Sequence, residues 1–260
     1  MQNRDRLVLL TNDDGVRAEG LLALKRELSG WGKVVVVAPS EERSAVSQGL
    51  TIHRPLRVFE VSESHYSLTG TPADCVIFAL RKMLPRFPDL VVSGINHGPN
   101  LGDDIIYSGT VAGAREAAIH QIPALAASAV GSRGNFTFSQ AAVFVRRLID
   151  ELFPFPKGTF LTVNIPDGDP VAYRFTRQGS KAAEGAIEEK RDPRGRTYYW
   201  IARDESEWMI EAETDHEAIR AGEVSVTPLQ RDQTDYGALA SYKKHREEIQ
   251  FERENRCSVS

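Results

Sequence analysis

The chain has little of what marks several large classes of protein. Its 260 residues include only two cysteines, Cys75 and Cys257, without the paired spacing that binds zinc or forms a redox motif. No apolar run approaches the roughly 20 residues that cross a membrane, and the first residues lack the apolar core of a secretion signal. We therefore expect a soluble cytoplasmic protein without a membrane partner.

An excess of basic residues, which nucleic-acid binding requires, is also missing. The chain has 32 Lys and Arg against 36 Asp and Glu, which gives a formal net charge of -4. Because contacts to phosphate dominate affinity for nucleic acid, this balance predicts no stable nucleic-acid partner. A small anionic substrate still fits if positive potential is local.

Short apolar runs alternate with helical patterns along most of the chain. This alternation predicts an α/β fold, a Rossmann-like, doubly wound and mostly parallel sheet with a C-terminal hairpin or arm. Helices are expected over 20–28, from Thr71 onward, from Ser108 onward, and between the strands expected over 124–127 and 160–164. Strands are expected over 7–10, 34–38, 56–61, 66–69, 90–93, 124–127, 160–164 and 224–228.

The chain divides by character into three parts. We assign residues 1–168 to a catalytic core, 169–236 to an arm that completes the same domain and mediates oligomerisation, and 237–260 to a polar, partly helical tail. Residues 179–215 are rich in charge but hold one aromatic run, 198–201, which predicts a projecting hairpin. Its aromatic face could pack on another subunit or on the core, or the hairpin could be a solvent-exposed excursion.

The first predicted strand ends in an acidic pair. Leu7-Val8-Leu9-Leu10 is followed directly by Thr11-Asn12-Asp13-Asp14-Gly15. Ligands of an open parallel sheet bind beyond the carboxyl ends of its strands, so Asp13 and Asp14 are well placed to hold a cation. An ordinary turn is the alternative, because Asn and Asp are common after strands.

Two more loops bring oxygen-bearing side chains to the same predicted edge. Ser44 follows the second core strand and Asn96 follows the third. Oxygen donors suit Mg²⁺, Mn²⁺ or Ca²⁺ and do not suit zinc. His97 lacks a partner His or Cys at ligand spacing, so we treat it as a loop residue near the site.

A possible anion site opens the helix that begins at Ser108-Gly109-Thr110. Backbone N–H groups and the positive helix end can bind an anion there, although ordinary capping explains the same residues. A cation beside an anion site implies a phosphate substrate. The segment from Gly94 to Gly102 matches neither a Walker motif nor a dinucleotide fingerprint, and we expect a tight loop.

Several segments, in order along the chain, resemble the stationary-phase survival proteins, the SurE family. The segments that carry this resemblance are Thr11 to Gly15, Ala38-Pro39 through Arg43-Ser44, Thr69 to Cys75, Ser93 to Asn100 and Ser108 to Ala114. Weaker similarity continues through 163–166, 174–178, 198–200 and 225–228. One departure follows Ser44, where Ala45-Val46-Ser47-Gln48 precedes the glycine that many members place at once.

The resemblance implies a metal-dependent 5′- and 3′-nucleotidase that can also shorten polyphosphate. By resemblance, Asp13 and Asp14 are catalytic and, with Ser44 and Asn96, ligate one divalent cation per subunit, Mg²⁺ or Mn²⁺. By the same resemblance, the phosphate pocket contains Asn12, Ser108, Gly109 and Thr110. The family also implies a homodimer or homotetramer with an exchanged C-terminal arm.

Other functional classes remain as alternatives. A phospho-acceptor signalling module would also carry an acidic pair after its first strand, but the third strand here ends near Ser93 and Asn96, not at an Asp, and the chain is about twice the length such a module needs. A phosphatase that forms an aspartyl-phosphate normally has two aspartates separated by one intervening residue, whereas Asp13 and Asp14 are consecutive. A metal-dependent glycosyl transferase would bind a nucleotide-sugar diphosphate and release little phosphate. No residue is assigned as general acid.

Overall fold

Strand β1 (Leu7–Thr11) is an inner strand, the fourth of a nine-stranded sheet, in the computed structural model of the chain. The structure describes residues 5–131, 136–168, 172–180, 186–202 and 211–257. All five β1 residues are buried, and β1 pairs in parallel with both neighbours, β2 (Lys33–Pro39) and β5 (Leu90–His97). A strand buried on both faces needs a continuous apolar run, which explains the Leu-Val-Leu-Leu sequence. The remaining strands, in sequence order, are β3 (Val58–Ser62), β4 (His65–Leu68), β6 (Ala124–Val130), β7 (Thr159–Pro166), β8 (Tyr173–Phe175) and β11 (Val224–Gln230).

The spatial order of the strands is β3-β4-β2-β1-β5-β6-β7-β11-β8. From β4 to β7 neighbouring strands are parallel, whereas β3 on β4 and β11 on β7 are antiparallel. The predicted α/β class and mostly parallel sheet are confirmed.

Two layers of helices cover the sheet, because successive side chains of each strand point to opposite faces. Val8 and Leu10 of β1 pack in the same buried cluster as α1 and α5, whereas Leu7 and Leu9 pack with α2 and α4. The helices are α1 (Glu19–Leu28), α2 (Pro72–Phe78) continued by the π-helical turn η2 (Ala79–Met83), α3 (Asp104–Tyr107), α4 (Gly109–Ile119), α5 (Phe138–Leu152), α6 (Asp215–Arg220) and α7 (Tyr236–Cys257). Within the described ranges, no helix combines the length and apolar character that a membrane crossing needs.

The prediction of a loop from Gly94 was wrong for residues 94–97, which continue β5. The register on β6 advances from Ser93↔Ala126 to Asn96↔Ser128, so β5 contains one extra residue and bulges. Gly94 has φ +134, and a Cβ there would lie 2.3 Å from the Ala127 carbonyl oxygen. Glycine therefore marks a bulge inside the strand, at the point where the chain turns toward the site.

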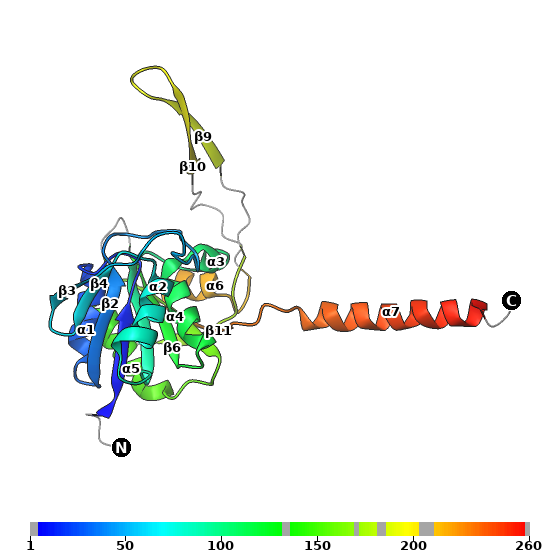
Figure 1. Ribbon diagram of the computed structural model, residues 1–260, viewed down its shortest axis with the longest axis horizontal. Helices are drawn as coiled ribbons and strands as arrows, with labels where there is room; N and C mark the ends of the chain where they lie inside the picture. Colours follow the sequence, from blue (N-terminus) through cyan, green and yellow to red (C-terminus); the bar gives the residue numbers. More distant parts are fainter. Residues whose placement is uncertain (1–4, 132–135, 169–171, 181–185, 203–210, 258–260) are drawn as a thin grey trace.

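The C-terminal part of the chain has two elements that project from the body (Figure 1). One is a two-stranded antiparallel hairpin of β9 (Ala186–Arg191) and β10 (Thr197–Ala202), and the other is α7. The hairpin's Tyr199, Trp200 and Ile201 are exposed, so they do not pack on the core of their own chain. Residues 181–185 and 203–210 of the predicted hairpin segment lie outside the described residues.

Candidate active site

The acidic pair lies at the carboxyl end of β1, where the chain leaves the sheet. Asp13 is buried and Asp14 is partly buried. The Asn12 amide group donates a hydrogen bond of 3.0 Å to the Gly15 carbonyl oxygen, which closes the turn after β1. Its Oδ1 atom is buried and has no hydrogen-bond partner among the described residues. Asn12 therefore shapes the turn and also presents an unsatisfied acceptor beside the two carboxylates.

The first turn of α4 packs directly on Asp13. The Thr110 hydroxyl donates a hydrogen bond to Asp13 Oδ1. A Cβ built on Gly109 would lie 2.8 Å from the Asp13 Cβ atom, so only glycine allows this approach without a shift. Ser108 caps α4, because its Oγ accepts a hydrogen bond of 3.0 Å from the Val111 N–H. The structure thus brings the predicted phosphate-binding residues against the predicted metal ligand, with the Ser108 and Thr110 hydroxyls already hydrogen-bonded.

The loop after β2 contacts Asp13 from another side. The Arg43 N–H donates a hydrogen bond of 2.7 Å to the Asp13 carbonyl oxygen. Ser44 is exposed, and its hydroxyl donates a hydrogen bond of 2.6 Å to Glu42 Oε1. The loop therefore meets the acidic pair where the sequence predicted, while the Ser44 hydroxyl binds Glu42 and would have to rotate to ligate a cation.

The end of β5 contacts Asp14. The His97 N–H lies 3.4 Å from Asp14 Oδ2, and His97 Nδ1 lies 3.8 Å from Asp14 Oδ1. Asn96 is half-buried, and its amide nitrogen donates a hydrogen bond of 2.9 Å to the Gly98 carbonyl oxygen. Because Nδ2 makes this bond, the Asn96 Oδ1 atom is available as an oxygen ligand. The three predicted loops meet at one edge of the sheet.

Both aspartates keep their protons to a higher pH than an ordinary carboxyl group does. Burial raises the pKa of Asp13 from 3.8 to about 6, although the Thr110 hydrogen bond opposes this and the charge of Asp14 adds to it. Burial also raises the pKa of Asp14 to about 6, opposed by the His97 N–H and reinforced by Glu42. Two carboxylates held together at this cost point to a bound cation, which favours their charged forms.

The donor set fits a hard cation. Among the described residues, no group of three His, Cys, Asp or Glu side chains is placed to hold a metal. The predicted ligands, two Asp carboxylates with neutral oxygens from Ser44 and Asn96, form a composition that Mg²⁺ and Mn²⁺ accept and zinc does not favour.

Two residues at or near this edge were not singled out from the sequence. Glu42 contributes negative charge near Asp14 and holds the Ser44 hydroxyl. Asp215, fully buried at the start of α6, accepts hydrogen bonds from the backbone N–H groups of Gly102, at 2.8 Å, and Gly179, at 3.0 Å. Asp215 thus fixes the loop that follows β5. Each lies in a charged stretch of sequence, so no local signal distinguishes it from surface acids.

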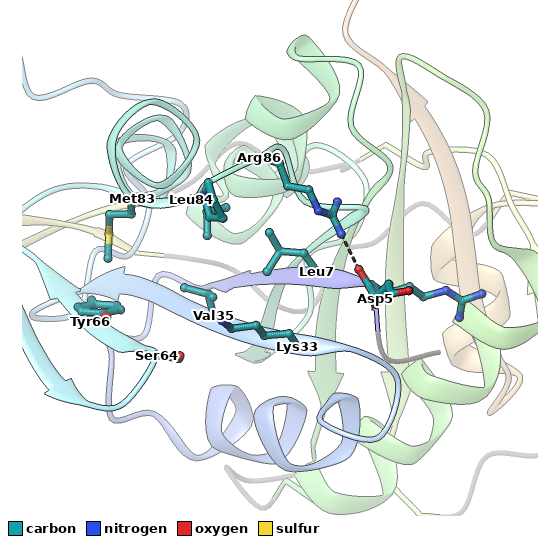
Figure 2. A pocket seen from close by; sticks show the side chains of 11 residues that line it. Asp5, Leu7, Lys33, Val35, Ser64, Tyr66, Met83, Leu84 and Arg86 are labelled. Atoms are coloured by element: carbon teal, nitrogen blue, oxygen red, sulfur yellow. Dashed lines mark hydrogen bonds between the residues drawn. The ribbon is translucent and has the colours of Figure 1, made fainter. Parts of the chain in front are cut away.

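A separate cavity of about 380 Å³ lies at the opposite end of β1 and β2 (Figure 2). Its walls include the apolar side chains of Leu7, Val35 and Met83. Arg86 spans its edge, where it donates a hydrogen bond of 2.6 Å to the Asp5 carbonyl oxygen. Asp5 supplies the one carboxylate side chain of this lining, so the cavity offers no acidic pair for a cation.

Comparison with known proteins gives one consistent family. The family model described as "Survival protein SurE" matches residues 8–185. The chain is 46% identical to the 5′-nucleotidase SurE of Geotalea uraniireducens over 242 residues, which cover 91% of this chain and 98% of that protein. It is 44% identical to the 5′-nucleotidase SurE of Desulforudis audaxviator over 248 residues, which cover 91% and 96% of the two chains.

A solved structure agrees with the sequence comparisons. The crystal structure of the SurE protein from Aquifex aeolicus superimposes with a TM-score of 0.82 at 42% identity, over 92% of this chain and 99% of that one. The likeness therefore extends beyond the core to most of the C-terminal part.

Proposed function

The chain belongs to the SurE family of survival proteins, and from this membership and the geometry of the site we propose that it is a metal-dependent phosphomonoesterase that hydrolyses nucleoside 5′-monophosphates. The observation that carries the proposal is the contact between the Asp13-Asp14 pair and the first turn of α4, because it joins a cation site to an anion site. Nucleoside 3′-monophosphates and polyphosphate are proposed as further substrates with the same terminal phosphoryl group.

Asp13, Asp14, Ser44 and Asn96 are the proposed ligands of one divalent cation per subunit, Mg²⁺ or Mn²⁺. Their oxygen donors, together with the raised pKa values of the two aspartates, support this assignment. When bound, such a cation supplies charge neutralisation at the phosphoryl oxygens and makes water a stronger nucleophile. Asp13 is the more deeply buried acid, and its hydrogen bond from Thr110 holds the carboxylate in one orientation.

The amino end of α4 is the proposed phosphate pocket. Backbone N–H groups at Gly109 and Thr110 lie at the positive end of an 11-residue helix, where an anion is stabilised. Glycine at 109 lets the phosphate oxygens approach the backbone closely. Asn12, which holds the turn after β1, borders this pocket in the proposal, and Ser108 contributes by capping the helix.

The projecting elements support a homo-oligomer. The hairpin exposes an aromatic run, and α7 is polar along most of its length, carries exposed Tyr236 and Tyr242, and extends from the body without packing on it (Figure 1). An isolated two-stranded hairpin is only marginally stable in water, and burying its aromatic run on a second subunit would stabilise it. We propose a homodimer or homotetramer in which C-terminal arms are exchanged.

The test of the activity is phosphate release from a substrate panel. AMP, 3′-AMP, polyphosphate and a nucleotide-sugar diphosphate are incubated with the protein in Mg²⁺, in Mn²⁺ and in a chelator. Release from AMP that the chelator abolishes and either metal restores is the expected result. Full activity in metal-free protein, or hydrolysis of none of the four, would overturn the proposal. The expected cytoplasmic location stays a prediction, and cell fractionation tests it.

A further inference from the structure

We propose that Tyr107 is the surface on which the base of a mononucleotide substrate stacks. This inference rests on the proposed nucleotidase activity and extends it to the part of the substrate that the acidic pair and the phosphate pocket do not address.

The position of Tyr107 beside the phosphate pocket is the first argument. Tyr107 ends α3 and directly precedes Ser108, the residue that caps α4. Thr110, three residues after Tyr107, donates a hydrogen bond to Asp13. The Tyr107 side chain is 59% exposed, although the residues that follow it, Ser108 to Thr110, are all buried. An aromatic ring is therefore open to solvent at the border of a buried polar site.

The backbone that carries this ring is fixed, which is the second argument. The Ser47 N–H donates a hydrogen bond of 2.8 Å to the Tyr107 carbonyl oxygen, and the Ser47 hydroxyl donates one of 2.7 Å to the Ile106 carbonyl oxygen. Gln48 holds the same loop to α4 through Glu116 at 2.7 Å. Ser47 has φ 51, a left-handed conformation that costs free energy and is kept by these contacts. The loop that carries Ser44 thus holds the end of α3 in one place.

The chemistry of the substrate is the third argument. A mononucleotide has a charged phosphate at one end and a flat, mostly apolar base at the other. The carboxylates and backbone N–H groups recognise only the charged end. The exposed Tyr107 ring, with Leu50 (51% exposed) on the adjoining loop, offers apolar surface for the other end. Because stacking needs only a π-face, such a surface accepts purines and pyrimidines alike.

Comparison of AMP with ribose 5-phosphate isolates this role. The two compounds share the phosphate and the leaving hydroxyl and differ by the base. In Tyr107→Ala we expect kcat/KM for AMP to fall by about tenfold or more, while that for ribose 5-phosphate stays within about twofold. Tyr107→Phe and Tyr107→Trp should keep the value for AMP. Phe59→Ala is the matched control, because Phe59 is 54% exposed on the edge strand β3, outside the loops that form the site.

Inhibition by adenosine provides a second readout, which does not depend on turnover of AMP. As a phosphate-free competitor of ribose 5-phosphate, adenosine should inhibit the unmodified protein and Tyr107→Phe, and inhibit Tyr107→Ala about tenfold more weakly. Equal losses for AMP and ribose 5-phosphate, or no loss for AMP, would overturn the inference. Failure of the nucleotidase proposal itself has a different signature, because the unmodified protein would then release phosphate from neither compound.

Discussion

A methyl group on Gly109 would lie 2.8 Å from the Cβ atom of Asp13 and 2.9 Å from its Oδ2 atom. The missing side chain at Gly109 therefore sets how closely the amino end of α4 approaches the acidic pair. The distance between the proposed cation site and the proposed phosphate pocket is thus controlled by one residue without a side chain.

Gly109→Ala should lower kcat/KM by about tenfold or more, because the added methyl group moves either Asp13 or the helix end by several tenths of an ångström. Ser108→Ala should be milder in activity and cost about 1 kcal/mol of stability, since it removes a helix cap. Gly30→Ala is the matched control, because a methyl group there meets no atom closer than 3.8 Å. Phosphate-release kinetics and urea denaturation measure the two effects. Equal activity in the Gly109 and Gly30 variants would contradict the assignment of the pocket.

Asp13→Asn and Asp14→Asn should each lower the rate about a hundredfold or more. Each change keeps the shape of the side chain but removes a charge from the proposed cation site, and a hundredfold corresponds to about 2.7 kcal/mol of transition-state stabilisation. Asp150→Asn, an exposed acid on α5, is the control. Isothermal titration with Mn²⁺ should show weaker binding in the two site variants only. Unchanged rates in both would remove these residues from the site.

The stability of the cation-free protein should depend on the protonation of the acidic pair. Because the folded-state pKa values of about 6 lie above the ordinary 3.8, the folded protein keeps protons that the unfolded chain has already released. The free energy of unfolding contributed by these groups is therefore present below about pH 4 and is lost as the pH rises toward about 6. Urea denaturation in a chelator should show a flatter profile for Asp13→Asn than for the unmodified protein across this window. Parallel profiles would show that the pKa of Asp13 is not raised.

Metal affinity should have the opposite pH dependence. A divalent cation must displace protons from Asp13 and Asp14, so its binding should weaken progressively below about pH 6. Titration calorimetry with Mn²⁺ at several pH values measures this, together with the protons released. Affinity that stays constant between about pH 5 and 7 would argue against the acidic pair as ligands.

Replacing Tyr199 and Trp200 together by Ser should shift the protein toward smaller species in light scattering. These rings are 62% and 60% exposed in the single chain, and burying them on a neighbour would supply the apolar contact that an isolated hairpin lacks. The exposed pair Phe59 and Val61 on β3, changed in the same way, is a control for lost surface hydrophobicity. An unchanged oligomer with unchanged thermal stability would exclude these rings from the interface.

The sequence predicted the core strands because burial on both faces demands an apolar run, as in β1 and β2. It also predicted that a helix starts at Thr71. In the structure Thr71 caps α2 and forms a capping box with Asp74. Local patterns failed where geometry depends on distant residues. The bulge at Gly94 requires the neighbouring Ala127 carbonyl, and short elements such as α3, α6 and β8 have too few residues for a period to be recognised.

The meeting of the loops after β1, β2 and β5 could be predicted from sheet topology alone. The directions of individual side chains could not. The Thr110 hydroxyl bonds to Asp13, which lies 97 residues earlier in the sequence, and the Ser44 hydroxyl bonds to Glu42, two residues before it. The role of Asp215 could not be predicted, because the backbone N–H groups that it binds lie far away in sequence, at Gly102 and Gly179.

The order of strands at one end of the sheet has a consequence for synthesis of the protein. β7 pairs on its outer side with β11, and among the described strands β8 pairs with β11 alone, although β8 is made earlier. While the ribosome makes the hairpin, an interval on the order of several seconds, β7 therefore remains an open edge and β8 has no strand to join. Open edges of this kind recruit foreign strands. Nascent chains that stall before Val224 should consequently be the species that chaperones bind and that aggregate first.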